Sequence, residues 1–396
     1  MLTLLAAAAL AGAPFQADPA AADRARTYEQ LYKDSGNGAL LWLAAEAHAL
    51  AGQDAQAIAA LRTFADARLG FEVTPDSPLH RLAGTADYDA LAKRLAADAR
   101  HAGDTSQLAA LSVPGFIPEG IAADPASGRL FVGDMAGKRI IVRDKEGRQS
   151  QFRSTGALRP LGMKVDPAAG LLRVAASTAF IASEKPETAL LSFDLQTGAL
   201  KHSATSPDMR SINDLAIAPN GDIYATDSLG GAVFRLRKGA DAFERVTEAA
   251  KMSYPNGIAI TPDGATLFVA QGASLRHIDI SSGAVTTVAH PPGLALLSLD
   301  GLYWHGGSLV AVQNGAGRGR ILRLELAGDL KSVTGFKVLE GSHPDFDIPT
   351  TGAIVGDSIV YIANSQLDHL EDDASISGTL TPIRLFRTGL GKPPAQ

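Results

Sequence analysis

The sequence predicts a mainly β fold, a six-bladed β-propeller preceded by a short α-helical region. Two observations lead to this prediction. From about residue 111 onward, apolar and polar residues alternate with a period of two between turns rich in Gly, Pro, Asn and Asp, which is typical of antiparallel strands. In addition, six segments of about 40–50 residues share one form, and such repeated antiparallel units are typical of propeller blades.

Each of the six segments opens with a pair of residues, in five of them a residue followed by Gly and in one Asn-Asp, and continues with a strand, a turn and a second strand. Their first residues are Glu119, Leu161, Asn213, Asn256, Asp300 and Thr351. No helical crossover pattern follows Arg100, which argues against a parallel sheet. A propeller cannot leave a blade edge unpaired, so we expect residues 107–113 and 381–387 to close the ring together. The propeller is predicted over residues 105–390.

The region before the propeller, residues 21–104, has a helical pattern. Residues 40–50 are rich in helix formers, Gly52 and Asp54 interrupt them, and residues 55–67 resume the helical period. The small residues Ala45 and Ala57 make this pair of helices resemble one tetratricopeptide hairpin. A further helix is predicted over residues 88–99. We interpret the region as a helical cap, with docking of a protein partner as the alternative.

Composition and charge exclude several classes of function. The 396 residues carry a formal net charge of −6 and contain no run of Lys or Arg, whereas binding to nucleic acid requires a basic surface. No cysteine is present, which excludes disulfides, thiolate metal sites and Cys nucleophiles. The absence of thiols is also compatible with an oxidising compartment.

The N-terminus resembles a secretory leader. Its apolar run is too short to span a bilayer and ends in the small residues Ala11, Gly12 and Ala13. We therefore expect a signal peptide over residues 1–20 and a periplasmic or secreted protein. The positively charged start of such leaders is missing, which suggests a start truncated by a few residues. No other segment is predicted to span a membrane.

Blade geometry predicts which side chains reach the central channel. The innermost strand of each blade lines that channel, so the six opening residues should form a ring at its mouth. The ends of the second strands should form a second ring further out on the same face. Its members are Asp134, Ser177, Asp227, Gln271, Asn314 and Asn364.

The composition of the inner ring indicates a metal site. Five of its six positions carry side-chain oxygens, and Glu119 and Asp300 are carboxylates that repel each other in a narrow, partly desolvated channel. A divalent cation removes that conflict. Oxygen ligands without Cys or His favour Ca²⁺, with Mg²⁺ or Mn²⁺ as alternatives, over zinc or copper. A polar channel without metal is the competing interpretation, because Asn and Asp before Gly are also common in turns.

Four motifs on successive blades resemble one known family. They are Pro118-Glu119-Gly120, Asn213-Asp214, Pro255-Asn256-Gly257-Ile258 and Asp300-Gly301. In this order they are similar to the senescence marker protein/gluconolactonase/luciferin-regenerating-enzyme family, whose relatives include paraoxonases and diisopropylfluorophosphatase. The resemblance covers about residues 111–390. It implies a catalytic calcium held by Glu119, Asn256 and Asp300, with Asn213 binding it directly or through water.

By the same resemblance, the protein is expected to be an exported calcium-dependent hydrolase of lactones or esters. Calcium would polarise a carbonyl oxygen, and Asp300 would act either as the general base for a water or as the nucleophile. Sugar-lactonase members carry an Arg two residues before the blade-three Asn, and this sequence has Ser211 there. The alternative is a non-catalytic propeller scaffold that binds a peptide, a protein or a cell-wall ligand.

Further residues are candidates for a substrate pocket on the metal face. They are Asp134, Asp227, Asn314, Asn364, His343 and His369. The two histidines lie on connections that should reach this face, where either could shuttle protons near neutral pH. A histidine exposed at the rim is the alternative for each.

Overall fold

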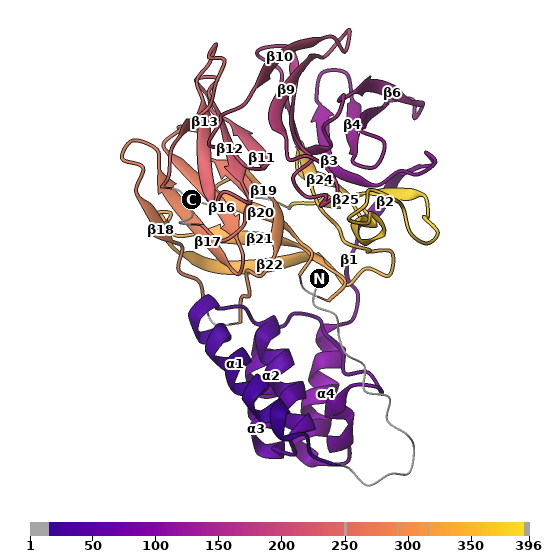
Figure 1. Ribbon diagram of the computed structural model, residues 1–396, viewed down its shortest axis with the longest axis vertical. Coiled ribbons are helices and arrows are strands. Elements are labelled where there is room, and N and C mark those ends of the chain that lie inside the picture. The colour runs from indigo at the N-terminus through magenta and orange to yellow at the C-terminus, as the bar shows by residue number, and fades with distance from the viewer. Residues whose placement is uncertain (1–15, 249–251, 292, 316, 392–396) are drawn as a thin grey trace. The chain divides into compact units, whose positions relative to one another are not determined.

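Six antiparallel sheets follow one another in a computed structural model that describes residues 16–248, 252–291, 293–315 and 317–391 (Figure 1). The described chain divides into two units, residues 1–100 with 292–297, and residues 101–291 with 298–396. The second unit is the six-bladed β-propeller predicted from the sequence. The predicted signal peptide lies mostly outside the described residues, and its last two, Pro19 and Ala20, begin the first helix.

The helical unit contains α1 (Pro19–Ser35), α2 (Ala39–Leu50), α3 (Asp54–Asp66), the 3-10 helix η1 (Pro78–Leu82) and α4 (Ala86–Asp98). The α2–α3 hairpin packs through buried alanines, and the Trp42 ring lies 5.1 Å from that of Phe64. Among the described residues, no helix is both long and apolar enough to cross a lipid bilayer.

The first three blades begin on the inner strands β3, β7 and β11. Blade one contains β3 (Pro118–Asp124), β4 (Arg129–Asp134), β5 (Arg139–Arg143) and β6 (Gln149–Ser154). Blade two contains β7 (Pro160–Asp166), β8 (Leu171–Ser177), β9 (Thr188–Asp194) and β10 (Leu200–Ala204). Blade three contains β11 (Ile212–Ile217), β12 (Ile223–Asp227), β13 (Ala232–Leu236) and β14 (Glu244–Arg245).

The next two blades begin on β15 and β19. Blade four contains β15 (Pro255–Ile260), β16 (Thr266–Gln271), β17 (Ser274–Asp279) and β18 (Val285–Thr287). Blade five contains β19 (Leu299–His305), β20 (Ser308–Gln313), β21 (Arg320–Leu326), β22 (Val333–Gly341) and the short β1 (Ala102–Gly103).

The sixth blade joins the two ends of the propeller. It contains β23 (Gly352–Val355), β24 (Ser358–Ile362), β25 (Ile383–Gly389) and β2 (Ser106–Leu111). The outer strand β2 comes from the start of the propeller and pairs antiparallel with β25 near its end (Figure 1). The inner strands contact one another in chain order, and β23 contacts β3. The predicted closing segments therefore do pair, with slightly different bounds.

The apolar core lies between successive blades, because both faces of most strands are buried. In β4, Phe131 packs into a cluster shared with blade two, whereas Leu130 and Val132 pack into a cluster shared with blade six. Alternate side chains of a strand point to opposite faces, so one strand serves two cores. This arrangement fixes the order of the inner strands around the channel, which is where the candidate site lies.

Candidate functional site

A single cavity of the propeller brings together the residues predicted to bind metal. It has a volume of about 220 Å³. It is lined by Glu119, Met135, Leu161, Phe180, Ile181, Asn213, Tyr254, Asn256, Asp300, Leu367 and Leu370. All four predicted ligands and Leu161 of the inner ring are among them. Thr351, the sixth ring position, instead uses its hydroxyl between blades, donating to the Glu119 carbonyl at 2.6 Å.

An irregularity at the start of each inner strand places these side chains. In blades one to five the pairing register shifts between the first residue and the fourth, as between Pro118 and Ile121. A bulge of this kind re-aims the side chains within it. The following glycine allows the close approach of the next blade, because a Cβ on Gly120 would lie 1.8 Å from the Leu161 carbonyl oxygen. This close packing explains why Glu119 and Asn256 are each followed by Gly, since a Cβ on Gly257 would likewise lie 2.0 Å from the Asp300 carbonyl oxygen.

The two predicted carboxylate ligands are buried and incompletely bonded. Glu119 and Asp300 are each 6% exposed. Glu119 Oε2 and Asp300 Oδ1 have no hydrogen-bond partner within the described part of the chain. Burial, followed by the negative charges of Asp300 and Asp214, raises the pKa of Glu119 well above its usual value. Burial and the charge of Asp214 raise the pKa of Asp300 to about 7.

A third carboxylate, Asp214, lies beside them and was not predicted as a site residue. It occupies the position where the blades on either side have Gly162 and Gly257, and a Cβ on Gly162 would lie 2.3 Å from Asp214 Oδ1. Asp214 Oδ1 accepts a hydrogen bond from Lys164 Nζ at 3.1 Å, while Oδ2 is buried without a partner among the described residues. Lys164 Nζ also lies 5.1 Å from the ring centroid of Tyr303. An Asp in place of the repeated Gly was the sequence signal for this group.

Neighbouring side chains orient the amide ligands. Asn213 Nδ2 donates to Ser228 Oγ at 2.8 Å, and Ser228 Oγ donates to the Pro255 carbonyl at 2.6 Å. This leaves the Asn213 carbonyl oxygen as its available atom. Asn314 Nδ2 donates to Asp300 Oδ2 at 2.7 Å, and the Asn256 side chain also hydrogen-bonds to Asp300. One Asp300 oxygen is therefore held, and the other remains available.

These observations fit a divalent cation. Three carboxylates face one ammonium group, Lys164, so that full ionisation leaves an excess of negative charge in a buried space. Buried carboxylate oxygens without partners are costly unless a cation or donor satisfies them. The available atoms are all carboxylate or amide oxygens, which hard cations such as Ca²⁺ prefer.

Three residues of the predicted second ring bond to the backbone, whereas Asn314 bonds to Asp300. Asp134 and Asp227 end their second strands as expected and Asn364 follows β24 by two residues, but all three are buried and do not line the cavity. Asp227 accepts from the backbone N–H of Arg210, Ser211 and Gly230, which fixes the loop before the inner strand. In the same way Asp134 accepts from backbone N–H groups and from an Arg side chain, and Asn364 accepts from a backbone N–H. The structure thus shows these three bonded to neighbouring loops and not among the residues that line the cavity.

The two histidine candidates also lie away from the cavity lining. His343 packs its ring against His101 and Phe386, with centroids 4.8 and 4.7 Å away. His101 Nε2 lies 2.6 Å from Glu340 Oε1, and the Thr105 N–H donates to Glu340 Oε2. The ligand atoms of His101, Glu340 and His343 lie within 4.8 Å of one another, but both Glu340 oxygens already have partners. His369 Nδ1 lies 2.7 Å from the Ser377 carbonyl oxygen in a surface loop.

The apolar side of the cavity was missed by the sequence analysis. Phe180 and Ile181 come from the connection between β8 and β9, and Leu367 and Leu370 from the connection between β24 and β25. Irregular connections carry no periodic signal, so their contribution depends on the tertiary fold. Tyr254 also lines the cavity, with a positive φ of 52°. Although 49% of Tyr254 is exposed, burial on the cavity side and the charges of Asp300 and Glu119 raise its pKa to about 12.

Comparisons with known proteins agree with the sequence motifs. Residues 117–293 match the family model described as the SMP-30/Gluconolactonase/LRE-like region. No curated protein matches the chain. A luciferin-regenerating enzyme has a similar structure, with 14% identity and a TM-score of 0.50, covering 73% of this chain and 96% of that one. At this identity the likeness concerns the fold alone.

Two bacterial structures give similar values. A gluconolactonase from Xanthomonas campestris has 19% identity and a TM-score of 0.49, covering 74% of this chain and 92% of that one. Regucalcin, a calcium-binding protein from Agrobacterium tumefaciens, has 17% identity and a TM-score of 0.49, covering 74% and 98%. The resemblance predicted from the motifs is confirmed: over residues 117–293 the propeller is similar to the SMP-30/gluconolactonase/LRE-like proteins.

Proposed function

We propose that the protein is a calcium-dependent hydrolase of lactones or esters. One observation supports the proposal above all: Glu119, Asn213, Asn256 and Asp300 line one cavity, and buried oxygens of both acids have no partner among the described residues. Carboxylate and amide oxygens are the ligands that calcium prefers. The match of residues 117–293 to a family that includes gluconolactonases supports the choice of reaction.

In this proposal Glu119, Asn256 and Asp300 hold the cation, and Asn213 completes the set with its amide oxygen. When bound, calcium supplies a Lewis acid that polarises the substrate carbonyl and stabilises the developing oxyanion. Asn314 and Ser228 orient Asp300 and Asn213 through the hydrogen bonds described above. Such outer partners fix the geometry of ligands and raise metal affinity.

Asp300 is the residue proposed to take part in the chemistry. As a general base, the Asp300 carboxylate takes a proton from water, the water oxygen bonds to the carbonyl carbon, and the C–O bond to the leaving alkoxide breaks. The proton then passes to the leaving alkoxide, which gives a hydroxy acid. As a nucleophile, Asp300 would instead form an acyl-enzyme that water hydrolyses. Label in the Asp300 carboxylate after a single turnover in ¹⁸O-labelled water identifies the second route, because only an acyl-enzyme attacked at the Asp300 carbonyl carbon can take it up. Attack at the substrate acyl carbon places the label in the product, as the first route does.

Thermal unfolding tests the metal site. After chelation, adding calcium at roughly 100 times its Kd should stabilise the native state by about 2.7 kcal/mol. Glu119→Gln and Asp300→Asn should lose this response, whereas Glu146→Gln, at an acid in the β5–β6 turn, should keep it. A wild-type protein that responds to none of calcium, magnesium and manganese contradicts the proposal. A panel of lactones and esters, assayed with and without calcium, then tests the reaction.

We also propose that the protein is exported and that its helical unit docks a protein partner. The apolar leader-like start and the absence of cysteine support export to the periplasm or medium. The α2–α3 hairpin contacts α1 and α4, but tetratricopeptide hairpins normally stack on several others, which supports a docked partner as the alternative to a helical cap. Fractionation of cells expressing the full chain tests the first, since a cytoplasmic product contradicts export. Cross-linking with and without residues 21–100 tests the second, since an unchanged set of products contradicts docking.

A further inference from the structure

The cavity has two chemically different parts. The oxygen-bearing residues Glu119, Asn213, Asn256 and Asp300 form its polar part. The remaining lining residues, which we call the apolar wall, are Met135, Leu161, Phe180, Ile181, Tyr254, Leu367 and Leu370. No Lys, Arg or His occurs among the lining residues in the described ranges. Apart from the Tyr254 hydroxyl, the wall offers a ligand no polar side chain.

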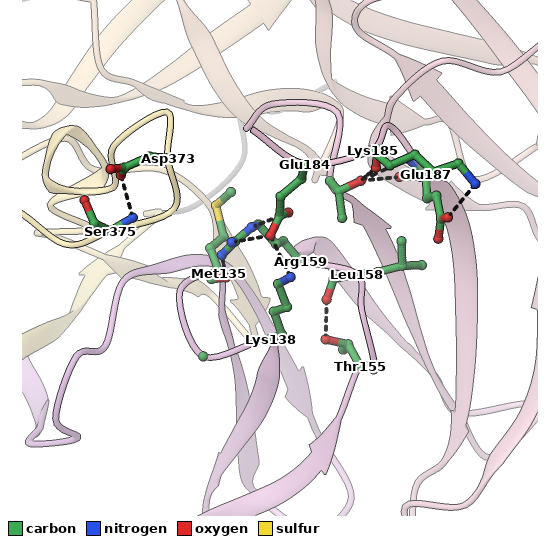
Figure 2. Close-up of polar contacts among 12 residues, drawn as sticks. Met135, Lys138, Thr155, Leu158, Arg159, Glu184, Lys185, Glu187, Asp373 and Ser375 are labelled. Carbon is green, nitrogen blue, oxygen red and sulfur yellow. Dashed lines mark hydrogen bonds and ion pairs between the residues drawn. The ribbon is translucent and has the colours of Figure 1, made fainter. Parts of the chain in front are cut away.

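A network of polar contacts holds the wall residues Met135, Phe180 and Ile181. Figure 2 shows its side chains Lys138, Arg159 and Glu184 beside Met135. Arg159 donates to both oxygens of Glu184, at 3.0 and 2.7 Å, and Lys138 Nζ donates to the same carboxylate at 2.7 Å. Arg159 also donates to the Met135 carbonyl at 2.5 Å. Because Glu184 lies on the same connection as Phe180 and Ile181, this network positions three wall residues at once.

The wall residues Leu367 and Leu370 belong to the connection between β24 and β25, which contains η2 (Leu367–His369). Gln366 and Thr381 exchange hydrogen bonds, with the Thr381 N–H donating to Gln366 Oε1 at 2.8 Å and Gln366 Nε2 donating to the Thr381 carbonyl at 3.1 Å. The Ser183 N–H donates to the Asp372 carbonyl at 2.9 Å and joins this connection to the first. Leu367, Leu370 and Phe180 all pack against the hydrophobic cluster that includes Met135 and Leu161. Contacts within the protein therefore hold the apolar wall in place without a ligand.

We infer that this site takes small lactones or esters with an alkyl or other apolar substituent, rather than polyhydroxylated sugar lactones. The inference rests on the proposed function, and it adds the class of substrate. The carbonyl group would lie at the polar part and the substituent against the apolar wall. An apolar cavity of about 150 Å³ holds a benzene ring, so this cavity of about 220 Å³ has room for a small ring with a short substituent.

Elementary energetics separate the two classes of substrate. Each methylene group that moves from water to the wall should raise affinity about fourfold. Each sugar hydroxyl that enters the cavity loses its hydrogen bonds to water, and the wall returns few of them. A hydroxyl left without a partner should lower affinity by about tenfold or more. Because a sugar lactone carries several hydroxyl groups, each without a partner at the wall, its affinity should be lowered several times over.

The test compares δ-valerolactone and its alkyl-substituted series with δ-gluconolactone in saturating calcium. We expect kcat/KM to rise about fourfold per methylene until the cavity is full, and δ-gluconolactone to fall below the unsubstituted ring. A higher kcat/KM for δ-gluconolactone than for the alkyl-substituted valerolactones overturns the inference and leaves the proposed function standing. If no lactone is hydrolysed, the proposed function fails. Binding of alkyl δ-lactams, which resist hydrolysis, still tests the wall by calorimetry, and an affinity independent of chain length overturns it.

Variants of the wall identify the surface that contacts the substituent. Leu370→Asn and Leu367→Asn should each remove the chain-length dependence for both lactones and lactams. The matched control is Leu200→Asn, because Leu200 is 54% exposed on the outer strand β10 and does not line the cavity. Unfolding temperatures of all three variants show whether the fold is intact. Retained chain-length dependence in both folded wall variants contradicts the inference.

Discussion

Lys164 Nζ lies 3.1 Å from Asp214 Oδ1, which places an ammonium group beside the three carboxylates of the candidate site. Lys164 lowers the pKa of Glu119, opposing the effects of burial and of the neighbouring acids. A positive charge of the protein itself thus lies beside the proposed cation ligands and offsets part of the repulsion among the three carboxylates.

Replacing this ammonium group should change the response to calcium. In Lys164→Met, we expect the chelated protein to lose about 2 kcal/mol of unfolding free energy, since Asp214 remains buried without its partner. The stabilisation by saturating calcium should exceed that of wild type. Chemical denaturation with and without calcium measures both effects. The double variant Lys164→Met/Asp214→Asn should recover stability, and a single variant equal to wild type would contradict the argument.

The hydrogen bond from Asn213 to Ser228 should govern affinity for the cation. Ser228→Ala frees the Asn213 amide to rotate and removes the donor to the Pro255 carbonyl. We expect calcium affinity to fall about tenfold, the range seen when outer partners of metal ligands are removed. Calorimetric titration measures it. Ser203→Ala, at an exposed position of β10, should leave affinity unchanged. Equal affinities in the two variants would show that Asn213 needs no support.

The close approach of adjacent inner strands should make Gly120 sensitive to substitution. A Cβ in Gly120→Ala would lie 1.8 Å from a backbone carbonyl, which no side-chain rotation can relieve. We expect a loss of about 3 kcal/mol or more in unfolding free energy. Gly328→Ala is the control, because its Cβ would meet nothing within 4 Å and should change stability by less than about 1 kcal/mol. Similar stability of the two variants would count against the packing shown here.

The ion pairs of Glu184 with Arg159 and Lys138 should make the stability of the protein depend on pH. Hydrogen bonds from Arg159 and Lys138 lower the pKa of Glu184 below its usual value. A lowered folded-state pKa contributes stability that is fully present above the unfolded-state value of about 4.3 and is lost as pH falls through the folded-state pKa. We therefore expect Glu184→Gln to unfold at a lower temperature than wild type at neutral pH, with the gap shrinking below about pH 4. A gap that stays constant from pH 7 to pH 3 would exclude this linkage.

Repetition made the fold and the polar part of the site predictable. Six blade starts share one form, so counting strands was enough to bring Glu119, Asn213, Asn256 and Asp300 to one channel mouth. The same counting placed Asp134 and Asp227 at the second-strand ends. It could not show that their carboxylates accept from the backbone of the preceding loop, because that depends on the loop's path.

The apolar wall and the contacts of Lys164 could not be predicted from the sequence for physical reasons, although the Asp in place of the repeated Gly marked Asp214. Phe180 and Leu370 lie on irregular connections of different blades, and only the closed ring brings them to one cavity. Lys164 comes from blade two and lies over the ring of Tyr303 from blade five, a contact between residues far apart in the chain. The wall depends on the path of two irregular connections, whereas the Lys164 contacts depend on how the inner strands β7, β11 and β19 pack around the channel.

The pairing of β2 with β25 also sets when the site can form. The strand that begins at Ser106 needs the strand that begins at Ile383, so the ring can close only after almost the whole polypeptide is available. Blade six separates Glu119 on blade one from Asp300 on blade five, and Thr350 and Thr351 hold the Glu119 carbonyl from that side. Until the ring closes, blade six does not lie between the inner strands that carry these two acids, and we expect their carboxylates to stay hydrated. We therefore expect their mutual repulsion to arise late in folding, when a cation can bind as the ring closes.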